Sequence, residues 1–182
     1  MNKFNFGPAF ENERIVFGAS RPGYPSKQVG INRVLEWISF MKDEDIKRIC
    51  CLLTQTQFSY YEGQNLLSIY QGEFRQDHVA SVEIEDYHLC DTYYLTERIL
   101  PFLNKSDIDG EKVVVHCSGG IGRTGFVLAA WLVYKYGLSE KKALAAVVKS
   151  GRNPFEAVEC GNATMDELYN LLRQCQKGNS PS

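Results

Sequence analysis

The sequence predicts an α/β domain in which a mostly parallel central sheet carries helices on both faces. Short apolar segments rich in β-branched residues alternate with longer segments whose apolar residues recur about every 3.6 positions. Strands that alternate with helices are typical of a parallel sheet, because each parallel connection needs a crossover. The 182 residues suffice for one sizeable core, and we assign all of them, 1–182, to a single domain.

The first half of the chain supplies three predicted strands and a helix between the first two. The strands are Arg14–Gly18, Arg48–Leu53 and Val79–Glu85, of which the second has the composition of a buried strand and the third alternates in part. Ser26 can cap the helix, whose apolar face is formed by Val29, Val34, Leu35, Ile38 and Met41.

Three more helices are predicted before the last strand. Two are short, Gln57–Tyr61 and Leu66–Phe74, and they lie on either side of Gly63. Asp91 or Thr92 caps the third helix, whose inner face is formed by Leu95, Ile99, Phe102 and Leu103.

The last third of the chain contains one predicted strand and three helices. They are Lys112–His116, Thr124–Tyr136, a helix from Ser139 through Val148, and Met165–Gln174. Three consecutive valines in the strand suit a sheet that is covered on both sides. Gly137 ends the first of these helices, and Thr164 with Glu167 forms a capping box for the last. The polar tail Lys177–Ser182 is expected to be loose.

Composition and charge exclude several classes of function. The formal net charge is −2, so no basic field attracts nucleic acid or an anionic membrane. No segment reaches the roughly 18 apolar residues of a membrane helix, and residues 1–14 lack the apolar stretch of a signal peptide. We therefore expect a cytoplasmic, monomeric protein that binds neither nucleic acid nor membrane.

Six cysteines do not predict disulfides, because nothing marks the chain as secreted. Cys50 and Cys51 lie in an apolar run and are expected to be buried. The chain has three histidines and no CxxC pair, so we expect no metal site.

The chemically informative segment is Val113–Gly125, which reads VVVHCSGGIGRTG. A buried strand ends in Cys117, five mostly small residues follow, and Arg123 opens a helix. The intervening glycines let successive N–H groups turn inward, and the helix N-terminus adds its positive end. Arg123 supplies a planar fork for two phosphate oxygens. The segment therefore predicts a phosphate cradle formed by Ser118, Gly119, Gly120, Ile121, Gly122 and Arg123.

Cys117 lies at the base of this predicted cradle, where the same dipoles favour its thiolate form. A thiolate can attack phosphorus without a separate base and form a thiophosphate that water then hydrolyses. Two other phosphate loops do not fit the segment. The Walker loop requires Gly-Lys-Ser/Thr, which is absent, and the Rossmann fingerprint requires an earlier place in the chain and a later acidic residue.

Ten consecutive residues, His116–Gly125 (HCSGGIGRTG), carry the pattern His-Cys-x5-Arg-Thr. This pattern resembles the signature of the cysteine-dependent protein tyrosine and dual-specificity phosphatase superfamily. The order of the elements from Arg14 to Gln174 is similar to the compact dual-specificity branch. The resemblance implies that His116 braces the loop, and that Thr124 hydrogen-bonds the sulfur and eases its departure in the second step.

A phosphate ester also needs an acid, because its leaving oxygen departs poorly unless it is protonated. In the superfamily this chain resembles, the acid is an aspartate on a loop upstream of the cysteine. Asp86 directly follows the third predicted strand, at the sheet edge where α/β domains place their sites. Asp91 is better explained as a helix N-cap. Asp86 is therefore our candidate acid.

Other features of the resemblance are absent. The chain has no Trp-Pro-Asp around the acid and no phosphotyrosine-recognition segment, which implies a shallower cleft. The glutamine that positions water in some tyrosine-specific members has no clear match, although Asn162 lies in the corresponding region. Arg21 and Arg152 could contact substrate, but residues of this kind are more often solvated at the surface.

We interpret the chain as a protein phosphatase that acts on phosphotyrosine, and in a shallow cleft also on phosphoserine and phosphothreonine, without metal or organic cofactor. Its partner is then a phosphorylated protein or peptide. The alternatives are a phosphatase for a phosphoinositide, nucleotide or other small phosphate, a catalytically inactive phosphate-binding module, and a sulfur-transfer enzyme. The loop lacks the lysines of phosphoinositide-directed relatives, and a binding module needs no nucleophile.

Overall fold

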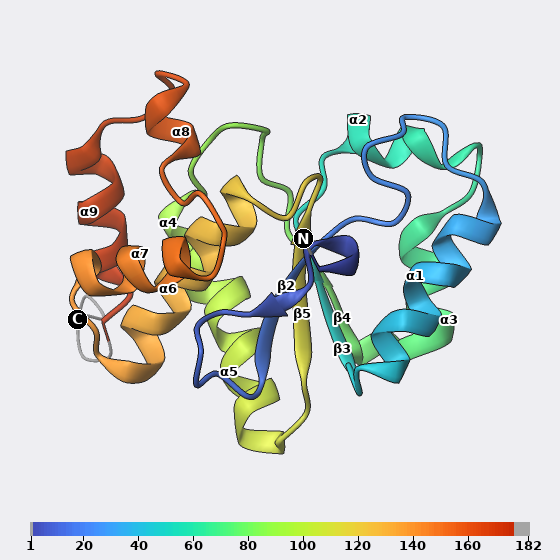
Figure 1. The fold of residues 1–182 in the computed structure, drawn as a ribbon, viewed down its shortest axis with the longest axis horizontal. Helices are drawn as coiled ribbons and strands as arrows, with labels where there is room; N and C mark the ends of the chain where they lie inside the picture. The colour runs from blue at the N-terminus through green and yellow to red at the C-terminus, as the bar shows by residue number, and fades with distance from the viewer. Residues whose placement is uncertain (1, 177–182) are drawn as a thin grey trace.

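A five-stranded sheet with the order β1-β2-β5-β3-β4 forms the centre of the computed structural model, which describes residues 2–176 (Figure 1). The strands are β1 (Gly7–Pro8), β2 (Val16–Ser20), β3 (Arg48–Cys51), β4 (Val79–Ser81) and β5 (Val113–Cys117). Strands β2, β5, β3 and β4 are parallel, and β1 alone pairs antiparallel, at the edge. The predicted mostly parallel α/β fold is therefore confirmed, while the predicted loose tail 177–182 lies outside the described residues.

The register of the sheet places three strand ends side by side. Ser20 at the end of β2 pairs with Cys117 at the end of β5, and Cys51 at the end of β3 pairs with His116. Because these strands are parallel, their carboxyl ends meet at one edge of the sheet. Cys117 ends the central strand of this edge.

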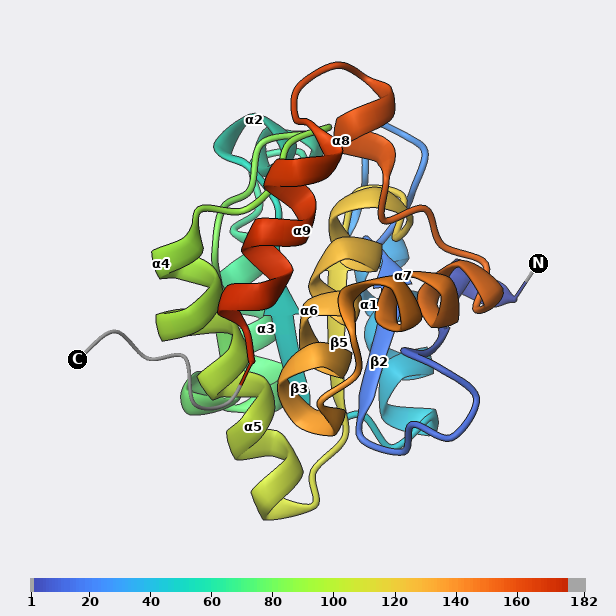
Figure 2. The same cartoon turned by 90° about the vertical axis from the view of Figure 1, so that its left-hand side faces the viewer.

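Helices cover both faces of the sheet, as predicted. Helices α1 (Ile31–Asp43) and α3 (Leu66–Phe74) lie on one face, and α5, α6, α7 and α9 lie on the other (Figures 1 and 2). The bounds of the remaining helices are α2 (Gln55–Phe58), α4 (Thr92–Tyr94), α5 (Leu100–Asp109), α6 (Gly122–Tyr136), α7 (Glu140–Lys149), α8 (Glu156–Glu159) and α9 (Met165–Gln174). Short turns η1 (Lys3–Asn5), η2 (Ser59–Tyr61), η3 (Gln76–His78) and η4 (Leu95–Ile99) complete the list.

Each face of the sheet has its own hydrophobic core. Trp37 and Met41 of α1 and Tyr70 of α3 pack with Val114 on one side. On the other side α6 is the central helix, and its residues from Gly122 to Val133 are all buried. The helix that follows the Cys117–Arg123 loop is therefore enclosed by the sheet, α5, α7 and α9.

Several predicted boundaries are wrong for identifiable reasons. Ser26 does not cap α1: its hydroxyl bonds to the backbone of Gln28 in a turn, and the helix begins after Gly30. Leu35 is 44% exposed and does not belong to the apolar face. Strand β4 ends at Ser81 instead of Glu85, because the pairing with β3 stops at the pair of Ser81 with Cys51.

Other predicted elements have the expected form. Helix α3 has the predicted bounds, and α9 begins with the predicted capping box between Thr164 and Glu167. The helix expected after Asp91 is divided into α4, the π-helical turn η4 and α5, and Pro101 supplies no backbone N–H where η4 gives way to α5. Among the described residues, none of the helices combines the length and the apolar character that crossing a membrane requires.

Candidate active site

Cys117 lies at the carboxyl end of β5 and begins a tight loop that leads into α6. Its side chain is buried, with 3% of its surface exposed. Helices α2 and α8 and the loop before α4 gather around this edge of the sheet (Figure 1). The structure therefore brings segments from distant parts of the sequence to the rim of the Cys117–Arg123 loop.

Three successive carbonyl groups of the loop are turned outward, and each accepts a hydrogen bond. Arg21 N–H donates to Ser118 O at 3.0 Å, and Asn5 Nδ2 donates to Gly119 O at 2.8 Å. Arg152 Nη1 donates to Gly120 O. Because these carbonyls are held by the surrounding scaffold, the loop keeps its shape without a ligand.

The N–H groups of the same loop are left free. Within residues 2–176, the N–H groups of Ser118, Gly119, Gly120 and Ile121 donate no hydrogen bond. The first N–H groups of α6, which begins at Gly122, also have no partner within the helix. A row of unpaired N–H groups beside a helix N-terminus is suited to binding a phosphate-like anion.

Gly120 is the residue that allows this loop to lie close to the sheet. Its φ is +73°, and a Cβ at this position would lie 2.4 Å from the carbonyl carbon of Ala19. The neighbouring atoms belong to the backbone of β2, which cannot move aside. Only glycine fits here, so the requirement is steric as well as conformational.

His116 supports the loop from the opposite face of the sheet. Its imidazole is fully buried, lies 3.3 Å from Tyr70 Oη through Nε2, and packs edge-on against Trp37. Burial lowers the pKa of His116 to about 3, so the ring is neutral. Nδ1 lies 3.4 Å from the carbonyl oxygen of Cys117. These contacts match the bracing role that the resemblance implies.

Arg123 uses one edge of its guanidinium for hydrogen bonds to the protein and leaves the other edge without a hydrogen bond. Nη1 donates to Leu52 O at 3.2 Å, Gln57 Oε1 at 3.0 Å and Ile84 O at 2.9 Å. Nε has no hydrogen bond, and Nη2 makes only an ion pair, at 2.7 Å, with Asp86 Oδ1. The Nε–Nη2 edge is the fork with which arginine binds two oxygens of a phosphate.

The structure separates the two candidate acids. Asp86 lies beside Arg123, and its Oδ2 accepts a hydrogen bond from Gln57 Nε2 at 3.1 Å. Asp91 Oδ1 accepts the N–H of Tyr93 at 2.8 Å and caps α4, as expected. Gln57, which sequence reasoning missed, therefore holds both Arg123 and Asp86.

Three other residues named from the sequence differ from expectation. Thr124 Oγ1 is buried and has no hydrogen-bond partner among the described residues, so the expected bond to the sulfur is not formed. Arg21 and Arg152 are not solvated surface residues, because only 1% and 5% of their surfaces are exposed. Arg21 Nε donates to Ser118 Oγ at 3.2 Å, and Arg152 Nη2 donates to Gly18 O at 2.8 Å. Both arginines therefore support the loop from outside.

Two exposed aromatic rings flank the loop. Tyr24 is 48% exposed and lies 3.4 Å from where a Cβ of Gly119 would stand. Tyr87 is equally exposed, follows Asp86 and lines a small cavity with Gly122 and Arg123. The amide of Asn162 donates to Tyr87 O at 3.0 Å, so Asn162 serves the loop of Asp86 rather than facing the cysteine loop.

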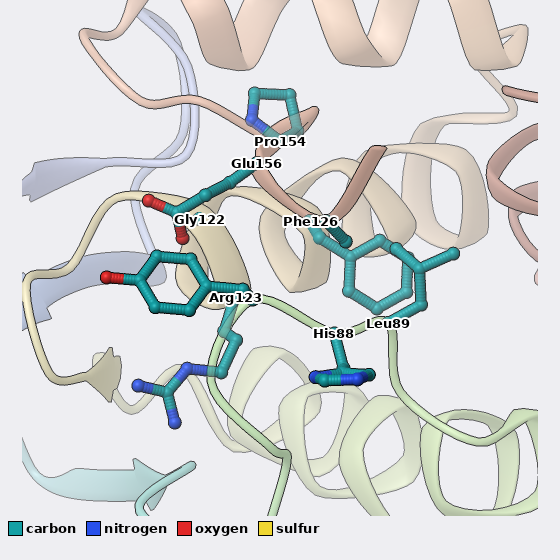
Figure 3. Close-up of a pocket in the computed structure, with 9 residues that line it drawn as sticks. His88, Leu89, Gly122, Arg123, Phe126, Pro154 and Glu156 are labelled. Carbon is teal, nitrogen blue, oxygen red and sulfur yellow. The ribbon is translucent and has the colours of Figure 1, made fainter. Parts of the chain in front are cut away.

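Glu156 is a second carboxylate at the loop, and no sequence motif pointed to it. It begins α8, and Figure 3 shows its side chain reaching toward Gly122 while Arg123 points away from it. A Cβ at Gly122 would lie 1.7 Å from Glu156 Oε2. The carboxylate therefore lies directly over the first residue of α6.

The dual specificity phosphatase catalytic domain family matches residues 44–160 of the chain. The crystal structure of Tk-PTP in its active form is similar, with a TM-score of 0.63 and 25% identity, over 87% of this chain and 93% of that one.

Two other solved structures have the same fold at lower identity. PTPMT1 in complex with PI(5)P has a TM-score of 0.64 and 14% identity, over 93% of this chain and 96% of that one. TpbA of P. aeruginosa in complex with pTyr has a TM-score of 0.57 and 14% identity, over 94% and 91%. At this identity the two likenesses support the fold alone.

Proposed function

Because the chain belongs to the dual specificity phosphatase catalytic domain family and is a cysteine-based phosphatase, we propose that it hydrolyses phosphotyrosine in proteins or peptides, as a single catalytic domain. The observation that carries this proposal is the Nε–Nη2 edge of Arg123, which makes no hydrogen bond, beside a loop whose N–H groups are unpaired. Both features suit the three equatorial oxygens of a phosphoryl group in the transition state.

In the proposed first step, Cys117 Sγ attacks phosphorus and the tyrosine oxygen leaves. The phosphate takes the place of Asp86 on the Nε–Nη2 edge of Arg123. Asp86, released from the ion pair, takes up a proton from solvent and passes it to the leaving oxygen. Gln57 keeps its contact with Arg123 Nη1 and so holds the guanidinium in the plane the phosphate needs. The product of this step is a cysteinyl phosphate.

The rim of the loop favours an aryl phosphate over a polyphosphorylated ligand. Tyr24 and Tyr87 present exposed rings on two sides of the loop, where they can pack against a substrate ring. Asp86 and Glu156 add negative charge at the rim, and the loop itself contains no lysine. This charge disfavours phosphoinositides and nucleotides, although PTPMT1, which has the same fold, was solved with PI(5)P.

The test is turnover, in the presence of a metal chelator, of peptides that differ only in carrying phosphotyrosine, phosphoserine or phosphothreonine, beside PI(5)P and nucleoside monophosphates. We expect kcat/KM to be highest for the phosphotyrosine peptide, by about 10-fold or more if ring packing contributes 1 to 2 kcal/mol. A higher kcat/KM for PI(5)P or a nucleotide would replace the proposed substrate class.

The aromatic rim has its own control. Tyr24→Ala should lower kcat/KM for the phosphotyrosine peptide more than for the phosphoserine peptide. Only the phosphotyrosine peptide has an aromatic ring that can pack against Tyr24. Tyr93→Ala removes a ring that is 61% exposed on α4 and should change neither value. Equal losses on both peptides in Tyr24→Ala would contradict the ring contact.

A further inference from the structure

Two carboxylates lie near the Cys117–Arg123 loop, and only one of them makes a hydrogen bond or an ion pair. Asp86 is held by Arg123 and Gln57 on the loop before α4. Glu156 comes from α8, lies over Gly122 and lines the same small cavity as Tyr87, the residue after Asp86. Two acids that approach one phosphate site from different elements can serve two different proton transfers.

Glu156 is unusual among the partly buried acids near the loop because no group in residues 2–176 pairs with it directly. Its carboxylate is partly buried and makes neither a hydrogen bond nor an ion pair with any of residues 2–176. Burial and the nearby charge of Asp86 raise the pKa of Glu156, while Arg123 lowers it. By contrast, the buried Glu13 accepts four hydrogen bonds, from Arg14 N, Ile15 N, Trp131 Nε1 and Tyr136 Oη.

An unpaired carboxylate beside a site for a phosphate dianion is unfavourable for substrate binding, so stability and affinity do not account for it. A carboxylate with a raised pKa is, however, a better base at neutral pH. The amide of Asn162, the other candidate for handling water, is already bonded to Tyr87 O. Glu156 is therefore the free polar group best placed to meet a water molecule above the loop.

On the basis of the proposed function, we propose that Glu156 is the base for the second step, in which water hydrolyses the cysteinyl phosphate. The water oxygen bonds to phosphorus while the S–P bond breaks, and the electron pair of that bond returns to Cys117 as a thiolate. One proton of the water passes to the Glu156 carboxylate, and the other stays on the released hydrogen phosphate. The proton on Glu156 then leaves to solvent.

This division of work separates the effects of the two carboxylates. Loss of Glu156 should slow the second step and leave the first step intact, so the cysteinyl phosphate should accumulate. In such a two-step reaction, kcat/KM reports the first step, whereas kcat reports the slower of the two. A purely structural role for Glu156 would lower both values.

The experiment is rapid mixing of Glu156→Gln with p-nitrophenyl phosphate, followed by acid quenching. We expect a burst of about one p-nitrophenol per active site, an unchanged kcat/KM and a kcat lowered by roughly 10². Phosphate should be recovered covalently on Cys117. Glu159→Gln, on the same helix, removes an exposed carboxylate that is bonded to Asn153 instead, and it should behave like the unchanged protein.

Two outcomes overturn the inference. In the first, Glu156→Gln keeps its kcat; in the second, it loses kcat and kcat/KM together with no phosphate on Cys117. Failure of the proposed function looks different. In that case Cys117→Ser would remain active, or the unchanged protein would prefer a phosphoinositide or nucleotide.

Discussion

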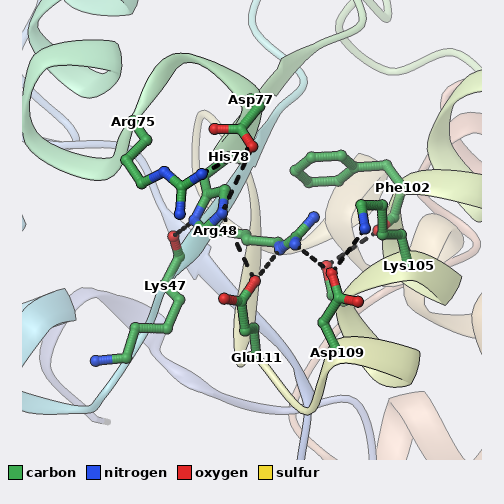
Figure 4. A network of polar contacts seen from close by, with 10 residues as sticks. Lys47, Arg48, Arg75, Asp77, His78, Phe102, Lys105, Asp109 and Glu111 are labelled. Carbon is green, nitrogen blue, oxygen red and sulfur yellow. Dashed lines mark hydrogen bonds and ion pairs between the residues drawn. The ribbon is translucent and has the colours of Figure 1, made fainter.

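Two buried arginines lie at opposite ends of the strands of the same sheet, and they differ in how completely their charge is paired. Arg48 begins β3, and its Nη2 and Nε each lie 2.6 Å from a carboxylate, Asp109 and Glu111 (Figure 4). Arg123 is the second residue of α6, at the carboxyl ends of the strands; it is equally buried and leaves Nε without a partner. Only the second arginine is available to an anion.

The difference shows how a buried charge can be recognised as structural or functional. Arg48 is matched on both sides by acids, which themselves contact Lys105 and His78, so this cluster is satisfied by the protein alone. Arg123 is matched by carbonyl groups on one edge and by the partly exposed Asp86 on the other. Incomplete pairing of a buried charge at the end of a parallel sheet is typical of a binding site.

The largest expected effect is at the end of the sheet that holds Arg123, where Cys117→Ser should abolish turnover. An alcohol is far less ionised than a thiol, so the loss should be roughly 10⁵-fold or more. Vanadate should still bind, because the free N–H groups and Arg123 remain. Turnover would be measured with p-nitrophenyl phosphate and binding by calorimetry. Substantial turnover by this variant would point to attack by water instead of sulfur.

Matched substitutions of the two arginines should separate activity from stability. Arg123→Lys removes the planar fork and should lower kcat/KM about 10³-fold. Arg48→Lys weakens a cluster on the far edge and should leave kcat/KM unchanged while lowering Tm by roughly 3 to 8 °C. Both variants need kinetics and thermal unfolding. A lower kcat/KM for Arg48→Lys than for Arg123→Lys would contradict the assignment of Arg48 as structural and Arg123 as functional.

A smaller effect is expected at the acid. Asp86→Asn should slow a phosphotyrosine peptide by about 10² and p-nitrophenyl phosphate much less, because an activated leaving group needs no proton. It should also flatten the alkaline limb of the pH–rate profile. Asp91→Asn should do neither, since asparagine caps α4 about as well as aspartate. If the two variants exchange these behaviours, Asp91 is the acid.

The last expected effect concerns His116; it appears in stability and leaves activity near neutral pH unchanged. The pKa of His116 is lowered to about 3 in the folded protein, below its ordinary value, so between these two values the unfolded chain binds more protons. Stability should therefore fall as pH decreases from about 6.5 toward 3, with a contribution of up to about 1.4 kcal/mol per pH unit. Urea unfolding of His116→Gln should show a weaker dependence on pH. His88→Gln, at an exposed position, is the control.

The parts of the site that could be predicted from the sequence are formed by residues that are contiguous in the chain. The strand, the glycine loop and Arg123 are contiguous, and the glycines report a backbone that only they can adopt. The alternation of elements likewise predicted the parallel sheet, because each crossover helix leaves a periodic apolar pattern. Asp91 was identified as a cap because that role depends only on the next few residues.

What could not be predicted depends on contacts between distant segments. Gln57 joins Arg123 to Asp86 across three elements, and nothing in its own neighbourhood distinguishes it from a surface glutamine. Glu156 lies over the loop only because α6 and α8 are packed together. Arg21 and Arg152 looked like surface residues because their acceptors are backbone carbonyls, which leave no mark in the sequence. Strand β1 has two residues, too few for a periodic pattern.

The carbonyl groups of the cysteine loop are held in part by residues outside the segment that the family matches. The family match starts at residue 44, yet two of the three donors to these carbonyls, Asn5 and Arg21, precede it. Asn5 adopts a left-handed conformation, with φ of 48°, which asparagine tolerates better than most residues. A chain shortened to the matched segment would keep Cys117 but lose the groups that hold the loop around it. The contacts that hold the cysteine loop therefore extend at least to Asn5, well before the segment that the family matches.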